Sequence, residues 1–473
     1  MRLYWYGLLM ILQKLLLRRN TGRVVCDFVE RMGVVYIKVA QILAMQNLGD
    51  LFTESDRQNL SRICDHCNPI KFSRIEKILQ AEYGADYSRH FRNVDQTPLG
   101  SASISQVHRA TLADGREVVL KIKRRDVTRR VQKDIRQIRR LIHRFGRFAK
   151  FRNFFGSDRA LECYIDWIME ETDFCKEQQN ILRYQEFANS VNDKIPRIQT
   201  RIVVPGLIAD LCTENIIVME YVSQPTISQL PLTNANKNRI SQAENDYIEL
   251  SFYALFHGLP VVFHGDPHGG NIYLDADDNF GFLDLGLIFE FSAEEAVLTR
   301  ELFLDAYTGK VEQIANLLFV HSQFKTVDRA TLIADMEAKI GQLHSMPVPQ
   351  FFVEMMMIFT QHDIAPPRFL FKMAKAFLAL FGLNTIMENH VGAEKLLAHQ
   401  ITEFYFSRTV NDVRTIFNSG LQLAPNFLHT TLQEGIGQGL SQQFSQLTDF
   451  SQQCQTALQN CREVLDLFQI GVK

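Results

Sequence analysis

Two neighbouring stretches of the chain decide its fold: FHGDPHGGNIYL at residues 263–274 and GFLDLGL at residues 281–287. Apolar runs flank both stretches, yet Asp266, Asn271 and Asp284 stand between these runs among several glycines. Burying such carboxylate and amide groups without partners is costly, so packing alone does not account for them. Their oxygen atoms are ligands that suit Mg²⁺, which proteins often share with substrate phosphates. We therefore expect these three side chains to surround the metal-bound phosphates of a nucleotide.

The order and spacing of these residues match a protein-kinase signature. Asp266 and Asn271 stand as D and N in the catalytic loop H-R-D-L-x-x-x-N, with Gly265 at the arginine position, and Asp284 opens a D-L-G where D-F-G belongs. Lys121, in VVLK, matches the strand lysine of V-A-I-K. Alone, a strand lysine is usually an edge residue and a D-x-G is usually a turn. Together, in this order, they predict a kinase-like protein.

A strand lysine of this kind needs a carboxylate to hold it. The helical segment that begins with ETDF at residues 171–174 offers several, and we prefer Glu177. At helical spacing it shares a face with Ile181 and Tyr184, which predicts that it points inward. We therefore predict Lys121, Glu177 and Asp266 as the catalytic residues.

Length and composition set broad limits. A chain of 473 residues is long for one compact unit, and its 46% hydrophobic content supports a sizeable core. A net charge of −2 gives no global attraction to nucleic acid. Eight scattered cysteines favour a reducing compartment, so we expect a cytoplasmic location. Cys64 and Cys67 form a single CxxC with no second pair, so we expect two thiols rather than a zinc site.

The chain reads as an α+β protein with a bilobal protein-kinase-like fold, an added N-terminal helical extension and a helical C-terminal tail. Strands are predicted at 118–123 and 216–222, and a hairpin joins NIYL to GFLD through the turn DADDN at 275–279. That turn lacks the glycine and the final glutamate of a calcium loop. The expected domains are a helical extension at 1–95, an N-lobe at 96–222, a C-lobe at 223–400 and a tail at 401–473.

Further motifs resemble one family, the UbiB/AarF atypical kinase-like proteins associated with ubiquinone and other isoprenoid-lipid metabolism. HGDPHGGN is similar to that family's H-A-D-P-H-P-G-N, and GSASISQVHRA at 100–110 to its alanine-rich loop. KVAQ at 38–41 stands where its K-x-G-Q signature falls, and ETDFCKE at 171–177 matches its E-x-D and D-F-x-x-E. The resemblance covers roughly residues 24–389.

The resemblance implies that Lys38 and Gln41 point toward the nucleotide phosphates, with Glu171 and Asp173 nearby. The K-x-G-Q helix of this family packs over the site where a protein kinase receives its peptide. Such packing would favour a small or lipid substrate, or ATP hydrolysis itself. Two departures bear on this expectation: Ala40 replaces the signature glycine, and Ser105 replaces a glycine of the alanine-rich loop. Neither change removes a charged ligand.

Each site residue has an expected role in binding ATP and Mg²⁺. Lys121 contacts the α- and β-phosphates, and Asp266 lies at the acceptor hydroxyl or water. Asn271 and Asp284 are the expected Mg²⁺ ligands.

The rest of the nucleotide is expected to contact backbone groups. The amides of Ala102, Ser103 and Ile104 should cover the phosphates, with a hydrogen bond from the Ser103 hydroxyl. The adenine should lie against 219–222 and pair with backbone groups of Glu220 and Val222.

Charge and hydropathy bear on contacts with membranes and nucleic acid. Residues 1–20 fall short of a span and suit either an interfacial helix or a buried one. The apolar segment 369–387 is interrupted by two lysines, so a buried helix is expected there. The basic stretch 121–152 suits anionic lipid headgroups or a solvated helix face. Any membrane contact is therefore expected to be peripheral, on the inner face, and no nucleic acid is expected.

Three functions remain open. The first is an ATP-dependent kinase or ATPase acting on an isoprenoid-lipid or quinone-precursor ligand. The second is a small-molecule phosphotransferase of the aminoglycoside or choline kinase kind, whose loop H-G-D-x-H-x-x-N is very similar but which lacks the KVAQ and ETDF helices. The third is a pseudokinase scaffold, favoured by Ala40 and Ser105.

Overall fold

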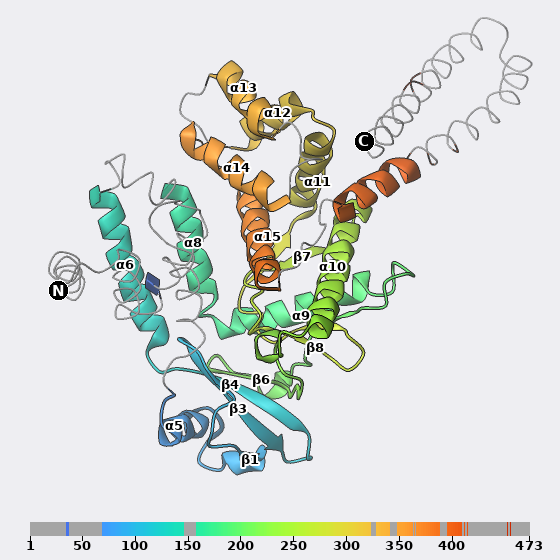
Figure 1. The fold of residues 1–473 in the computed structure, drawn as a ribbon. Helices are drawn as coiled ribbons and strands as arrows, with labels where there is room; N and C mark the ends of the chain where they lie inside the picture. Colours follow the sequence, from blue (N-terminus) through green and yellow to red (C-terminus); the bar gives the residue numbers. More distant parts are fainter. Residues whose placement is uncertain are drawn as a thin grey trace, which may run out of the picture.

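The computed structural model describes residues 35–36, 69–145, 158–322, 328–340, 348–362, 364, 366–387 and 395–408, with single positions at 411, 414, 452 and 455. Figure 1 shows a small sheet-containing lobe at the bottom and a larger, mostly helical lobe above it. The predicted segment 1–20, the KVAQ motif and the CxxC lie outside the described residues.

The first lobe is an antiparallel five-stranded sheet in the order β1-β3-β4-β6, with β2 paired to β3. Its strands are β1 (Phe91–Val94), β2 (Gly100–Ser101), β3 (Ser105–Leu112), β4 (Glu117–Lys123) and β6 (Ile216–Glu220). The helix α5 (Phe72–Tyr83) and the short 3-10 turn η1 (Tyr87–Arg89) precede the sheet. Ile75 and Leu79 of α5 are fully buried in one cluster with the apolar residues of the sheet.

Two sequence predictions need correction in this lobe. The first 95 residues were expected to be helical, but β1 is a strand, and with α5 it shares the core of the sheet. The strand expected at 216–222 ends at Glu220, so Val222 lies in the connection that follows. The predicted strand at 118–123 is confirmed as β4, entered through a turn in which Gly115 has a φ of 95°.

In the described part of the connection that follows β4, the chain forms the helices α6 (Val127–Phe145), α8 (Asp158–Glu170) and α9 (Phe174–Val191). Figure 1 shows α6 and α8 side by side, apart from the sheet. An ion pair of 2.6 Å joins Arg139 of α6 to Glu162 of α8. In α9, Glu177, Ile181 and Tyr184 are all buried, as the helical spacing predicted.

The second lobe is built around α10 (Asn234–His257) and two small sheets. In one, β7 (Val261–His264) pairs antiparallel with β10 (Ile288–Phe291). In the other, β8 (Ile272–Leu274) and β9 (Phe280–Phe282) form the predicted hairpin, and β5 (Ile202–Val203) runs parallel to β9. The strands β5, β7 and β10 were not predicted. Two 3-10 turns, η2 (Ala209–Leu211) and η3 (Ile227–Gln229), lie in the connections.

The hairpin turn is held by Asp275, whose carboxylate accepts hydrogen bonds from the backbone of Asp277 and Asn279 at 2.9 and 3.0 Å. Asp278 takes a φ of 61°, a left-handed conformation that aspartate tolerates. The carboxylate therefore serves the turn, in agreement with the prediction of a hairpin rather than a calcium loop.

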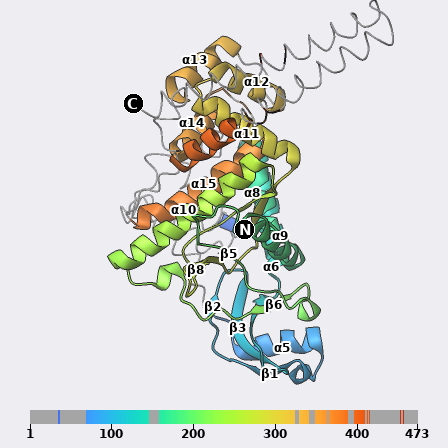
Figure 2. The same ribbon diagram turned by 90° about the vertical axis from the view of Figure 1, so that its right-hand side faces the viewer.

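Helices close the second lobe, and Figures 1 and 2 show them stacked beyond α10. They are α11 (Ala293–Tyr307), α12 (Val311–His321), α13 (Arg329–Ile340), α14 (Val348–Gln361) and α15 (Arg368–Met387). The helical residues 395–408 also bury Leu397, Ile401 and Tyr405 in the main core, so this core crosses the predicted boundary at 400. Among the described residues, none of the helices combines the length and the apolar character that a membrane span requires.

Candidate active site

Lys121 contacts two carboxylates that come from other parts of the fold. From β4, its Nζ donates to Glu177 Oε1 on α9 at 2.6 Å and lies 2.9 Å from Asp284 Oδ2, which follows β9. The side chains of Lys121 and Glu177 are 6% and 1% exposed, whereas that of Asp284 is 40% exposed. Of this triad, the Asp284 carboxylate is therefore the member that a ligand reaches first.

The electrostatics of the triad keep Lys121 and Asp284 charged. Burial lowers the pKa of Lys121, but the two carboxylates outweigh burial and hold its pKa above the usual value. Burial alone would raise the pKa of Asp284, but Lys121 and the Gly286 amide hold that pKa far below its usual range. For Glu177, burial outweighs the attraction of Lys121 and raises the pKa of the carboxyl to about 7. Asp284 therefore remains an anion over the physiological pH range.

The glycine of the D-L-G segment lies close to the carboxylates of the triad. The Gly286 amide donates to Asp284 Oδ1 at 2.9 Å, and a Cβ at this position would lie 3.1 Å from that oxygen. It would also lie 3.7 Å from Glu177 Oε2. The preceding residue is tied to α9, because Asn180 donates its side-chain amide to the Leu285 carbonyl at 2.9 Å. The segment is thus held to the helix that carries Glu177.

His264 links the two aspartates, a role that the sequence motif alone did not give it. Its Nδ1 accepts the Asp266 amide at 3.0 Å, and its Nε2 lies 2.6 Å from the Asp284 carbonyl. Because a carbonyl only accepts, Nε2 carries the proton and the ring is neutral. Burial lowers the pKa of His264 to about 4, which keeps it neutral at physiological pH.

Backbone hydrogen bonds hold Asn271 and Asp266 in the loops next to His264 and Asp284. The Asn271 carbonyl accepts the Leu283 amide at 2.8 Å, which places Asn271 opposite the residue before Asp284. The Asp266 carbonyl accepts the His268 amide at 2.9 Å in the turn after β7. Both side chains are partly exposed. The structure therefore brings Lys121, Glu177 and Asp284 into contact and sets Asp266 and Asn271 on the adjoining turns.

The alanine-rich loop is a tight turn between β2 and β3. The Ala102 amide donates to the Ser105 carbonyl at 3.0 Å, so the Ser103 and Ile104 amides are the remaining candidates for phosphate. Ser105 is 2% exposed and belongs to β3. Arg124, which was not predicted from the sequence, fixes the loop with two hydrogen bonds. Its backbone amide donates to the Ile104 carbonyl at 2.9 Å, and its guanidinium donates to the Ser101 hydroxyl at 2.7 Å.

One of the backbone groups expected to pair with adenine, the Glu220 amide, already has a hydrogen-bond partner. The Glu220 amide donates to the Gly206 carbonyl at 2.9 Å, and the Glu220 carboxylate accepts the Gly206 amide at 2.8 Å. This leaves the Glu220 carbonyl and the Val222 backbone as the groups for an adenine edge.

The remaining predicted residues divide into two sets. Lys38 and Gln41 lie outside the described residues, although Tyr36 just before them contacts Gln137 of α6 at 3.4 Å. Glu171 passes close to the D-L-G segment, because its Cα would lie 3.9 Å from a Cβ at Gly286. The Asp173 carboxylate caps α9 by accepting the Cys175 and Lys176 amides.

The donor set of the site fits Mg²⁺ shared with a phosphate. Within the described part of the chain, no three His, Cys, Asp or Glu side chains gather as a metal cluster. Mg²⁺ in phosphotransferases is usually held by one or two protein oxygens together with substrate phosphates and water. The ionised, partly exposed Asp284 and the neighbouring Asn271 supply oxygens of that kind.

A bilobal α+β fold with a strand lysine held by a helix glutamate and facing a D-x-G aspartate defines a kinase-like protein. The sequence model of the ABC1 atypical kinase-like domain matches residues 62–318. The chain belongs to this ABC1 atypical kinase-like family, which confirms the fold class and the resemblance drawn from the motifs.

Curated relatives are distant. The chain is 31% identical over 279 residues to an uncharacterized protein of Mycobacterium tuberculosis, which covers 57% of this chain and 54% of that protein. It is 26% identical over 317 residues to a probable protein kinase UbiB of Erwinia tasmaniensis, with 66% and 55% covered. The chain spans about half the length of the curated relatives it matches.

The fold is also seen in a solved structure, that of Rv3197 from Mycobacterium tuberculosis in complex with erythromycin. The TM-score is 0.50 and the identity 19%, over 82% of this chain and 93% of that one. At this identity the similarity concerns the fold alone.

Proposed function

We propose that this protein binds ATP with Mg²⁺ and acts as an atypical kinase or ATPase in support of isoprenoid-quinone synthesis. The observation that carries the nucleotide part is the contact of Lys121 with Glu177 and Asp284 at 2.6 and 2.9 Å. The motif resemblance to UbiB/AarF proteins and the UbiB name of a relative support the quinone part.

Each residue then has a task that follows from its position. Lys121 neutralises phosphate charge while Glu177 keeps its ammonium in place. Mg²⁺, when bound, would neutralise further phosphate charge, and Asp284 and Asn271 are the residues that would hold it. Asp266 is the carboxylate that would orient or deprotonate an acceptor hydroxyl or a water.

The substitution Asp284→Asn tests the nucleotide site directly. It removes the anion without changing the size of the side chain, so we expect Mg²⁺-dependent stabilisation by ATP to disappear. A ligand at 100 times its Kd stabilises by about 2.7 kcal/mol, which thermal denaturation resolves easily. Asp278→Asn, in the hairpin turn, is the matched control and should keep the full effect. Wild-type stabilisation in Asp284→Asn would remove Asp284 from the site.

Turnover is tested by ADP release in the presence of vesicles and quinone-precursor-like phenols. We expect a phenol-stimulated rate in the wild type that Asp266→Asn lowers by about 10²-fold or more. A tight-binding protein that releases no ADP under any of these conditions would instead be a pseudokinase.

We further propose that α6 makes peripheral contact with anionic lipid. Its buried residues Val131, Ile135 and Ile138 lie on one side of the helix. At 100° per residue, four exposed cations fall on the opposite side. They are Arg129, Lys133, Arg136 and Arg140. Each cation near such a surface contributes about 1 kcal/mol.

Sedimentation with phosphatidylserine vesicles tests the lipid contact. Changing the four α6 cations to glutamine should weaken vesicle binding by at least tenfold, because most of the attraction is lost. The control variant changes Arg74 and Lys77, two exposed cations of α5. Equal binding by the α6 variant and the wild type would refute the contact.

A further inference from the structure

Lys375, on α15, reaches the catalytic loop from a distant part of the sequence. Its Nζ donates to the Gly265 carbonyl at 2.7 Å, across 110 positions of the chain. The same ammonium lies 5.5 Å from the ring centre of Trp167 and 5.6 Å from that of Phe289. The two rings contact each other, with 4.9 Å between their centres, so the ammonium lies to one side of the pair and at the carbonyl of the residue that precedes Asp266.

The Gly265 carbonyl belongs to the peptide unit that leads into Asp266, and this unit is held at both ends. Its oxygen accepts from Lys375, and its N–H, which is the Asp266 amide, donates to His264 Nδ1 at 3.0 Å. A peptide unit is planar, so fixing its oxygen and its hydrogen fixes the rotation of the whole plane. That rotation sets the direction in which the Asp266 side chain leaves the backbone.

Because residue 265 is a glycine, the catalytic loop packs directly against Leu287. Gly265 is buried, and its amide donates to the Leu287 carbonyl at 2.8 Å. A Cβ at this position would approach Leu287 Cγ to 2.5 Å and the Leu287 carbonyl to 2.9 Å. The catalytic-loop pattern of protein kinases has an arginine here, and a glycine instead allows the close backbone approach. Lys375 brings a cation to the Gly265 carbonyl from α15.

A role in packing alone does not favour a lysine at this position. Trp167 and Phe289 are 4% and 2% exposed, and an apolar side chain packed against them would avoid the cost of desolvating an ammonium. The cation gains from the faces of the two rings and from a charge-assisted hydrogen bond. Both gains depend on its being placed at the loop carbonyl.

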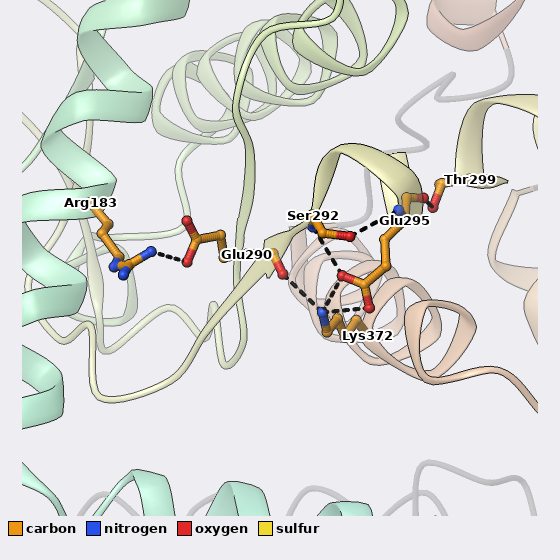
Figure 3. A network of polar contacts seen from close by, with 6 residues as sticks. All are labelled: Arg183, Glu290, Ser292, Glu295, Thr299 and Lys372. Atoms are coloured by element: carbon orange, nitrogen blue, oxygen red, sulfur yellow. Dashed lines mark hydrogen bonds and ion pairs between the residues drawn. The ribbon is translucent and has the colours of Figure 1, made fainter. Parts of the chain in front are cut away.

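The helix that carries Lys375 is itself anchored one turn earlier. Lys372 donates to the Glu290 carbonyl at 2.9 Å and to both carboxylate oxygens of Glu295 at 2.9 and 2.7 Å. Figure 3 shows this network, in which Glu295 and Ser292 also cap the start of α11. Residues three apart share a helix face, so Lys372 and Lys375 approach β10 and the loop from the same side.

We infer that Lys375 is a positioning residue of the catalytic loop, which fixes the Gly265 peptide and thereby aims Asp266. The part of this inference that concerns turnover rests on the proposed function. Its structural part, the restraint of the loop, is independent of any reaction.

Hydrogen exchange without nucleotide tests the restraint. Lys375→Met should speed exchange of the backbone amides at 265–271 by about tenfold or more, because a hydrogen bond from a charged donor is lost. Lys375→Arg keeps a charged donor and should restore slow exchange. Lys372→Met removes an equally placed lysine and should lower overall stability without a change confined to the loop. Should the methionine variant not fold, Lys375→Gln, which is polar but shorter, replaces it.

ADP release supplies the second readout. In Lys375→Met, kcat should fall by about 10- to 100-fold while the Kd for Mg-ATP stays within about twofold, since a small displacement of a catalytic group has effects of that size. Unchanged exchange at 265–271, or an increase of the same size in Lys372→Met, would overturn the inference. If the wild type releases no ADP, the proposed function fails, and the exchange result alone decides the role of Lys375.

Discussion

His264 shows how one buried side chain organises a site at the scale of a residue. Its two ring nitrogens bond to the backbone of Asp266 and of Asp284, so both aspartates take their positions from one neutral imidazole. The ring also stacks on Phe282 of β9, with 4.8 Å between ring centres. Protonation of this ring would place a second donor against the Asp266 amide and break the bridge.

The stability of the protein should therefore fall in mild acid. A histidine whose pKa drops from 6.5 to about 4 on folding contributes stability above pH 6.5, and this contribution is lost as the pH falls toward 4. The full effect amounts to about 3 kcal/mol. Urea denaturation at fixed pH should show that the wild type loses more stability than His264→Gln over this range. Parallel pH profiles for the two proteins would contradict the assignment.

At the scale of an element, α9 is placed by its first residues. The Asp173 carboxylate accepts two backbone amides of the first turn, at 3.0 and 3.2 Å. This cap fixes where the helix starts, and Glu177 follows one turn later. A motif that the family resemblance connects with the nucleotide thus also defines the helix that holds Lys121.

Two substitutions at Asp173 separate its roles. Asp173→Ala removes the cap and should cost about 1 kcal/mol of unfolding free energy, whereas Asp173→Asn keeps a capping side chain and should cost a few tenths. Chemical denaturation measures both. Equal losses in the two variants would argue against capping. A loss of Mg-ATP binding in Asp173→Asn at unchanged stability would give the charge a task of its own.

At the scale of the whole molecule, the core of the second lobe extends beyond the residues that the family model matches. Phe377 of α15 stacks on Phe252 of α10 and on Phe352 of α14, with ring centres 5.6 Å apart in both pairs. It also contacts Phe263 of β7 at 5.6 Å. The strand that leads into the catalytic loop is therefore packed against helices that follow residue 318.

Truncating this ring should destabilise the lobe strongly. Phe377 is 1% exposed, so Phe377→Ala should lower the free energy of unfolding by about 3–5 kcal/mol through lost burial and the cavity left behind. Phe406→Ala is the control, since that ring is 60% exposed and its loss should change stability by less than about 0.5 kcal/mol. Similar losses in both variants, measured by urea denaturation, would refute the central position of Phe377.

Much of the fold could be predicted because its signals are local. The strand of Lys121, the hairpin around Asp275 and the inward face of α9 follow from periodicity and turn residues within a few positions. The strands β7 and β10 were missed because both are almost entirely buried and show no alternation of polar and apolar residues. They pair across more than twenty positions, which no local pattern reveals.

The sequence by itself determined which residues form the kinase-like set, because a fixed order of motifs is a property of the chain. It also determined the helix face of Glu177 and the turn that precedes Asp284. Only the tertiary structure decided that His264 bridges two aspartates, that Arg124 fixes the alanine-rich loop and that Lys375 reaches Gly265. The reason is physical: these contacts join different elements or loops within a lobe, and their distances exist only after each lobe has folded.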